Sequence, residues 1–235
     1  DPAGLEMVGG TRGRFPDATS VADLDEALAS IPEQMARGFT TFCIKPSQFI
    51  DDPEISEYLG TLGARLTQVT SGARHDFEFF AVRDVSINAF ALPGGKVAFW
   101  EGMMPIAQDD NGIAVVMGHE IAHALARHGA ERMSQTMGAQ AIGELLAAGV
   151  GQVKPGMRDD FLKVYGLGAT VGVLLPWGRT QESEADRIGL TLMAKAGFDP
   201  ASAIAFWERM SKVAGDKPPE FLSTHPSDAT RINQL

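Results

Sequence analysis

The chain has 235 residues, of which 44% are hydrophobic and 21% are charged, and these are the proportions of a soluble globular protein with one sizeable core or two small ones. No basic stripe offsets the formal net charge of −10, which argues against nucleic acid as a partner. Cys43 is the single cysteine, so an internal disulfide and a metal cage of thiolates are both excluded.

The first part of the chain predicts an exposed lead followed by two helices. Residues 1–20 are rich in Gly, Pro and Arg and are expected to form an exposed or flexible N-terminal lead. Apolar residues at helical spacing predict a helix over residues 21–32. A second helix is expected over residues 53–67, with Asp51 or Asp52 as its N-cap.

Three short apolar runs predict a small β portion. Residues 77–82 alternate as a strand does, and residues 87–92 and 96–100 form a hairpin around a Pro-Gly-Gly turn. We expect 87–92 to be an exposed edge, which would offer unpaired N–H and C=O groups to an extended peptide. A plain structural hairpin explains the same residues equally well.

The helix expected over residues 110–129 contains His119-Glu120-x-x-His123. Helical residues four apart share a face, so His119 and His123 can bind one zinc ion. Glu120 lies beside that face and can reach a water on the metal, as a general base must. A chance spacing in a core helix would bury these polar groups without partners. His128 should point about 140° away from His123 and is expected to be structural.

Two apolar stretches rich in glycine and alanine follow, at residues 137–150 and 164–177. At roughly 14 residues each, they are shorter than the ~20 residues that span a bilayer as a helix. They predict either buried core helices or a surface that rests against something apolar, and a peripheral membrane contact is one form of the second reading.

A further helix is expected after Thr180, its predicted cap, and it carries Glu182 and Asp186. Carboxylates four residues apart share a helix face, so one could bind the zinc while the other accepts a hydrogen bond from a ligand imidazole. The alternative is a solvated acidic helix start.

Asp199 and Pro200 open one more amphipathic helix. His225 then lies in a loop before Pro226, where a solitary histidine is usually a surface residue.

Together these motifs resemble the zinc metallopeptidases of family M48. Four ordered motifs within residues 45–235 carry the resemblance: residues 88–95, His119-Glu120-x-x-His123, Glu182-x-x-Ala185-Asp186-x-x-Gly189 and His225-Pro226-Ser227.

The resemblance implies a gluzincin fold with one Zn²⁺ per chain. Its ligands would be His119, His123 and Glu182, its catalytic base Glu120, and Asp186 would support the ligands from behind. The expected fold class is α+β and mostly helical, with a small mixed sheet whose edge strand flanks the active-site helix.

The resemblance also assigns roles outside the metal helix. The strand holding Asn88, Ala89, Phe90 and Ala91 would bind substrate backbone. His225 would lie near the metal, where it could either stabilise the oxyanion or occupy the open coordination site and hold the enzyme latent.

Two departures favour the compact bacterial members related to Oma1 and Ste24. No segment is a convincing transmembrane span and no helical repeat array follows the last motif. We therefore expect a single peptidase domain over residues 21–235, located in the periplasm or cell envelope by family analogy.

The sequence thus predicts a zinc endopeptidase that acts on extended or unfolded protein segments, with a role in envelope protein quality control. Its partners would be protein or peptide substrates. The alternative is a zinc-bound, chaperone-like binding module in which His225 fills the fourth position and cleavage is absent or rare.

Overall fold

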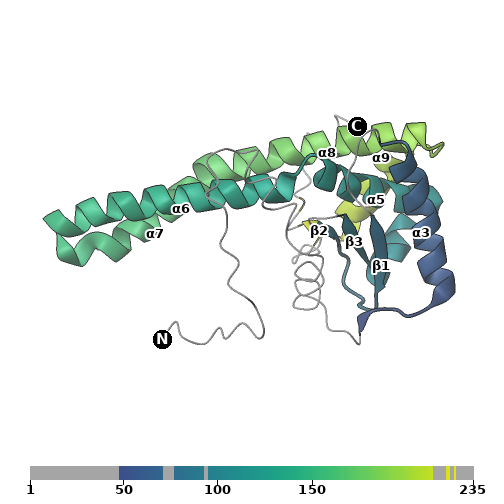
Figure 1. Ribbon diagram of the computed structural model, residues 1–235, viewed down its shortest axis with the longest axis horizontal. Coiled ribbons are helices and arrows are strands. Elements are labelled where there is room, and N and C mark those ends of the chain that lie inside the picture. Colours follow the sequence, from purple (N-terminus) through teal and green to yellow (C-terminus); the bar gives the residue numbers. More distant parts are fainter. Residues whose placement is uncertain (1–47, 71–76, 93–94, 214–220, 223–224, 226–235) are drawn as a thin grey trace, which may run out of the picture.

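The computed structural model of the protein describes residues 48–70, 77–92, 95–213, 221–222 and 225. The lead expected at 1–20 and the helix expected at 21–32 lie outside these residues. Figure 1 shows a globular body, which holds the sheet with α3, α5 and α9, and a long arm formed by α6 and α7. The helix α8 runs from the arm into the body.

The elements in chain order are α3 (Pro53–Gln68), β1 (Glu78–Val82), β2 (Ala89–Leu92), β3 (Lys96–Trp100), η2 (Glu101–Met103), α4 (Met104–Ala107), α5 (Asp110–Leu125), α6 (His128–Val153), η3 (Pro155–Met157), α7 (Arg158–Ala169), η4 (Thr170–Leu174), α8 (Leu175–Lys195) and α9 (Ser202–Val213).

The helix α3 begins where the sequence predicts. Asp52 is its N-cap, and its carboxylate accepts hydrogen bonds from the backbone N–H groups of Glu54 and Ile55 at 2.9 and 3.3 Å. Pro53, which has no N–H to leave unpaired, takes the first helical position. The buried leucines of α3 then pack into the main core against the sheet and α5.

The small mixed sheet confirms the predicted fold class. The strand order is β1-β3-β2, with β1 parallel and β2 antiparallel to β3. Gly95 has φ 86°, which glycine adopts without strain, at the end of the predicted hairpin turn. All five residues of β3 are buried. Since β3 is the central strand, β2 is an edge strand among the described residues, as expected.

The helix α5 runs through the centre of the body. Asp109 rather than Asp110 or Asn111 is its N-cap, and its carboxylate accepts a hydrogen bond from the N–H of Gly112. The helix ends at Leu125, before the expected end at Gly129. Arg127 has φ 57°, in the left-handed region, which breaks the helical path. Consequently His128 does not continue α5 but begins α6.

The helices α5 and α8 approach each other at two glycines. A Cβ atom placed on Gly189 would lie 2.9 Å from the carbonyl carbon of Gly118 and 3.0 Å from the nitrogen of His119. Any larger side chain at Gly189 would therefore push backbone against backbone. This close contact brings Glu182 and Asp186 of α8 opposite the histidines of α5.

The two apolar stretches lie in the arm, which we define as residues 133–178. The side chains of Leu145, Val164 and Leu167 are 75%, 73% and 69% exposed, so the expectation of buried core helices is wrong. The reason is that α6 and α7 pack mainly on each other: the Tyr165 ring covers the Cβ position of Gly143. Two helices in a hairpin bury one face each and leave the others exposed.

The second apolar stretch also belongs to a longer helix than predicted. The run Arg158–Lys195 is helical over 38 residues, and one 18-residue window in it is apolar enough to cross a membrane by length and composition. The helix continues past Pro176 because η4 is a π-helical turn, in which the N–H of Leu175 donates to the C=O of Thr170. Thr180, the predicted cap, therefore lies inside α8.

Candidate metal centre

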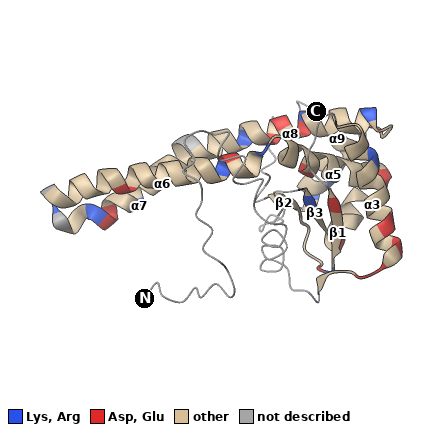
Figure 2. Cartoon of the chain, viewed as in Figure 1, with Lys and Arg blue, Asp and Glu red and all other residues tan. Residues whose placement is uncertain are grey.

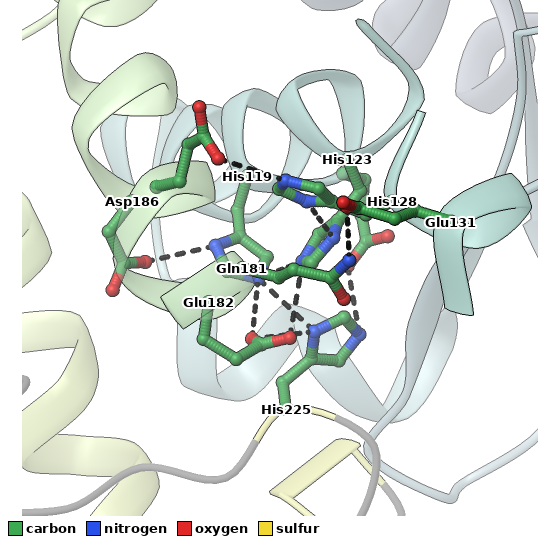
Figure 3. Close-up of polar contacts among 10 residues, drawn as sticks. His119, His123, His128, Glu131, Gln181, Glu182, Asp186 and His225 are labelled. Atoms are coloured by element: carbon green, nitrogen blue, oxygen red, sulfur yellow. Dashed lines mark hydrogen bonds and ion pairs between the residues drawn. The ribbon is translucent and has the colours of Figure 1, made fainter. Parts of the chain in front are cut away.

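Four buried side chains from three parts of the chain converge on one point (Figure 3). They are His119 and His123 of α5, Glu182 of α8, and His225, which follows α9 in the sequence. Each offers one ligand atom, and these atoms all lie within 4.8 Å of one another. The structure thus brings together the three expected ligands and the loop histidine.

The spacing of these atoms suits a tetrahedral zinc ion. Four ligands about 2.0 Å from a zinc ion at the corners of a tetrahedron are separated by about 3.3 Å. His119 Nε2 lies 3.0 Å from His123 Nε2 and 3.2 Å from Glu182 Oε2. His123 Nε2 lies 3.4 Å from Glu182 Oε1. The residues fit a metal ion, and a set of imidazoles with one carboxylate is a donor set that zinc accepts.

A hydrogen bond on the far side of the His119 ring directs the lone pair of its Nε2 toward this centre. The Nδ1 of His119 lies 2.9 Å from Oδ1 of Asp186, the support expected from the sequence. When Nδ1–H donates to this carboxylate, a neutral imidazole presents only a lone pair at Nε2. That lone pair faces the Glu182 carboxylate, which also accepts. A cation between the two acceptors is therefore stabilising.

The charge states of two ligands suit metal binding as well. Burial lowers the pKa of His123 to about 3, so this imidazole is neutral near pH 7. Burial alone would raise the pKa of Glu182, but the ring nitrogens of His119, His123 and His225 that face its carboxylate outweigh burial and hold that pKa far below its ordinary value. A neutral imidazole and an ionised carboxylate are the forms that coordinate metals.

Glu120 lies beside the cluster rather than in it. It is buried, and burial raises the pKa of its carboxyl, although the nearby His225 and His119 partly oppose this. Its Oε1 receives no hydrogen bond from the described residues and lies 3.3 Å from Nε2 of His225. The backbone N–H of Ala91 in β2 donates a hydrogen bond to the Glu120 carboxylate. A buried carboxylate with an open acceptor atom is placed to take and return a proton.

His225 is part of the cluster, not a surface histidine. It is 4% exposed, and its Nδ1 lies 3.0 Å from Glu182 Oε2 and 3.2 Å from His119 Nε2. The backbone N–H of His225 donates to the backbone C=O of Phe221, and the His225 ring lies against the Phe221 ring. These contacts place one nitrogen of His225 on the metal side and the other beside Glu120.

The substrate residues expected on β2 lie next to Glu120. The C=O groups of Asn88 and Leu92 accept hydrogen bonds from Trp100 and Gly95. Backbone groups alternate in direction along an antiparallel strand, so those of Ala89 and Ala91 turn toward the free edge. The Ala91 N–H that reaches Glu120 belongs to this set. Phe90, between them, packs its ring against Trp100.

The role of His128 was missed from the sequence. Its Nδ1 lies 2.9 Å from Nδ1 of His123, and its Nε2 lies 3.4 Å from Glu184 Oε2. It is not among the ligand atoms, as expected, but it contacts a ligand from behind. The turn at Arg127 makes this contact, and no glycine or asparagine at that position signals a left-handed residue.

Replacing His128 by alanine is expected to lower the affinity for zinc by about 10- to 100-fold, because the ring that orients His123 is lost. Competition with a fluorescent chelator measures this affinity. Thr136→Ala is a matched control, since Thr136 is exposed on α6 and its hydroxyl donates only to the C=O of Arg132. Equal affinities for His128→Ala and the parent, in variants that unfold at the same temperature, would show that His128 only fills space.

Comparison with known proteins identifies the family of the chain. The model of peptidase family M48 matches residues 55–235. Mitochondrial metalloendopeptidase OMA1 of Schizosaccharomyces pombe is 40% identical over 180 residues, which are 76% of this chain and 51% of that protein. The putative beta-barrel assembly-enhancing protease of Vibrio cholerae is 36% identical over 189 residues, or 78% of this chain and 39% of that protein.

A third relative extends over more of the chain. The beta-barrel assembly-enhancing protease of Yersinia pestis is 30% identical over 235 residues, or 95% of this chain and 48% of that protein. The chain thus spans about half the length of these relatives, or less. Because the family model covers most of the chain and includes every motif of the converging site, the chain belongs to peptidase family M48.

Proposed function

We propose that the chain is a zinc-dependent endopeptidase. The observation that carries the proposal is the cluster of His119, His123 and Glu182 at the spacing of a tetrahedral metal site, with Glu120 beside it. Zinc held there would polarise a peptide carbonyl and make a water more acidic. The names of the relatives, a metalloendopeptidase and assembly-enhancing proteases, support the same reaction class.

The residues of the chain would carry the proton steps. Glu120 takes a proton from the water that attacks the scissile carbonyl, and later delivers it to the leaving amine nitrogen. Its buried environment favours this exchange, since burial raises the pKa of its carboxyl. Asp186 keeps the His119 imidazole in one tautomer during both steps.

The edge strand β2 would hold the substrate. A peptide whose N–H groups pair with the C=O groups of Ala89 and Ala91 would lie extended, with its main chain beside Glu120. Only an unfolded or flexible segment can adopt this geometry, because a folded segment has already used its own backbone groups. Asn88 and Phe90 would hold β2 against β3. The C=O of Asn88 accepts a hydrogen bond from the N–H of Trp100, and the Phe90 ring packs against the Trp100 ring.

Cleavage of one protein in two states tests this proposal. We expect the zinc-loaded chain to cut a protein whose disulfides have been reduced and blocked, and to leave the native form of the same protein intact. Products are identified by mass spectrometry. Internal cuts indicate an endopeptidase, whereas removal of terminal residues only, or equal cleavage of both forms, would contradict the proposed use of β2.

A zinc-bound binding module is the second candidate. The observation that favours it is His225, whose Nδ1 stands where a fourth ligand would close the site. With all four positions filled, a metal keeps no place for water. An endopeptidase held latent by His225 and a permanent binding module share this geometry, and cleavage after substitution of His225 distinguishes them.

The proposal extends to location and role. The bacterial relatives are named as beta-barrel assembly-enhancing proteases, which favours the expected periplasmic or cell-envelope protease in protein quality control, whereas the Schizosaccharomyces pombe relative is named as mitochondrial. The exposed arm supports the expected contact with a membrane. Extraction of cell envelopes with salt or detergent would show in which fraction the chain resides.

A further inference from the structure

The arm presents its apolar side chains to the surroundings. Ile142, Leu145 and Leu146 of α6 and Val164, Leu167 and Val171 of the returning helix are all more than 45% exposed. None of the apolar 18-residue window within Arg158–Lys195 is buried inside the protein. Exposed apolar area on this scale marks a contact with another apolar phase.

Charged residues lie at the base of the arm and in its outer half. Residues 164–178 of the returning helix contain no charged residue, and neither do residues 133–143 of α6. In the outer half, residues 154–163 carry five charges, and Glu144, near the middle of the arm part of α6, is ion-paired with Arg158. At the base, α6 carries Arg132 and α8 carries Arg179. Figure 2 shows the uncharged band between the base of the arm and its outer half.

The apolar side chains point in several directions around the arm. At about 100° per residue, Met133 and Ile142 lie on opposite sides of α6, and Leu145 lies between them in direction. A protein partner, including a second copy of this chain, covers one face of a helix pair. Lipid, by contrast, surrounds a helix pair on all sides. Because the arm has exposed apolar side chains on every free side, a bilayer fits it better than a protein partner does.

We propose that the arm inserts its uncharged band into the acyl layer of a lipid bilayer, tip first. Fifteen uncharged residues of the returning helix rise about 22 Å, against about 30 Å for the hydrocarbon core. The long side chains of Lys154 and Lys163 reduce this mismatch by extending toward the far headgroups, and the bilayer thins locally. Trp177, at the base of the band, lies at the near headgroups, where tryptophan is favoured.

Insertion would hold the metal centre close to the membrane surface. Glu182 follows Trp177 by five residues on the same helix, a rise of about 7.5 Å. If the proposed function is correct, the substrates within reach are unfolded segments near that surface. The insertion itself does not depend on cleavage, so the two proposals can fail separately.

The intrinsic fluorescence of Trp177 provides a direct test. Of the three tryptophans, Trp100 and Trp207 are buried and Trp177 is 46% exposed. The full chain is mixed with phosphatidylcholine vesicles that contain a minority of phosphatidylglycerol. We expect the chain to float with the vesicles and the emission of Trp177 to shift to shorter wavelength. Lipids brominated near the headgroup should quench Trp177 more than lipids brominated near the chain end.

Variants make the test specific to the arm. In the double variant Leu167→Trp, Trp177→Phe, the new tryptophan should be quenched more by lipids brominated near the chain end than by lipids brominated near the headgroup. The double variant Ile142→Glu, Leu167→Glu should reduce vesicle binding by at least about 10-fold, because charges in the acyl layer are costly. Val85→Glu is the matched control, since Val85 is 85% exposed but belongs to the body, and it should bind as the parent does.

Three outcomes would overturn the proposal. The first is a chain that stays with the aqueous fraction. The second is equal loss of binding in Val85→Glu and the arm variant, which would show nonspecific adsorption. The third is a dimer in lipid-free buffer that the arm variant dissociates while vesicles have no effect, which would assign the arm to a second copy of the chain. Equal circular dichroism spectra of the variants and the parent exclude misfolding as the cause of lost binding.

Discussion

Replacing Glu120 by glutamine is expected to lower kcat/KM for an unfolded protein substrate by about 10²- to 10⁴-fold, the usual contribution of a general acid–base. Glutamine has nearly the same shape, but its amide cannot accept a proton at neutral pH. Because Glu120 lies beside the ligand atoms rather than among them, the variant should bind zinc as the parent does. The loss should therefore appear in kcat more than in KM.

Glu57→Gln is the matched control for this substitution. It removes the same charge from an exposed site on α3 and should leave cleavage unchanged. Zinc content and unfolding temperature are measured for both variants. A Glu120→Gln protein that retains zinc and cleaves as fast as the parent would show that another group moves the proton, and the proposed mechanism would be wrong.

Replacing His225 by alanine is expected to increase cleavage by about 10-fold or more, which corresponds to a preference of at least ~1.4 kcal/mol for the closed arrangement. In the structure His225 has one nitrogen on the metal side and the other 3.3 Å from Glu120 Oε1. It thus occupies the place that a water needs and faces the base that would activate it. Initial rates on the same unfolded substrate measure the change.

The direction of the change separates three roles for His225. A gain indicates a latent enzyme. A fall in kcat with unchanged zinc content indicates that His225 assists the reaction, for example by stabilising the developing oxyanion. No cleavage by the parent or by His225→Ala, in proteins that hold one zinc ion each, supports the binding module and contradicts the endopeptidase.

Much of the candidate site could be predicted because it depends on local spacing. His119 and His123 share a face of α5, and Glu182 and Asp186 share a face of α8, for the same reason: residues four apart on a helix are neighbours. The sheet was predictable as well, because a Pro-Gly-Gly turn between two apolar runs has few alternatives. These features require no knowledge of distant contacts.

The features that were missed depend on single backbone turns. Arg127 adopts φ 57°, and this redirects His128 toward His123 although their spacing on a continuous helix would separate them. The π-turn η4 carries the helix through Pro176, so the second apolar stretch is part of a helix of 38 residues rather than a separate short one. The position of His225 depends on its contact with Glu182, which is distant in the sequence and which no local pattern indicates.

Metal content and cleavage, measured on the same sample, test the central claim most directly. The chain is purified without chelator, analysed by inductively coupled plasma mass spectrometry, and assayed on an unfolded protein before chelation, after it, and after zinc is restored. The parent or, if the parent is latent, His225→Ala should hold one zinc ion per chain, lose cleavage with the metal and regain it with zinc. Cleavage that persists in a metal-free sample, or a His119→Ala variant that keeps its zinc, would contradict the assignment of this site.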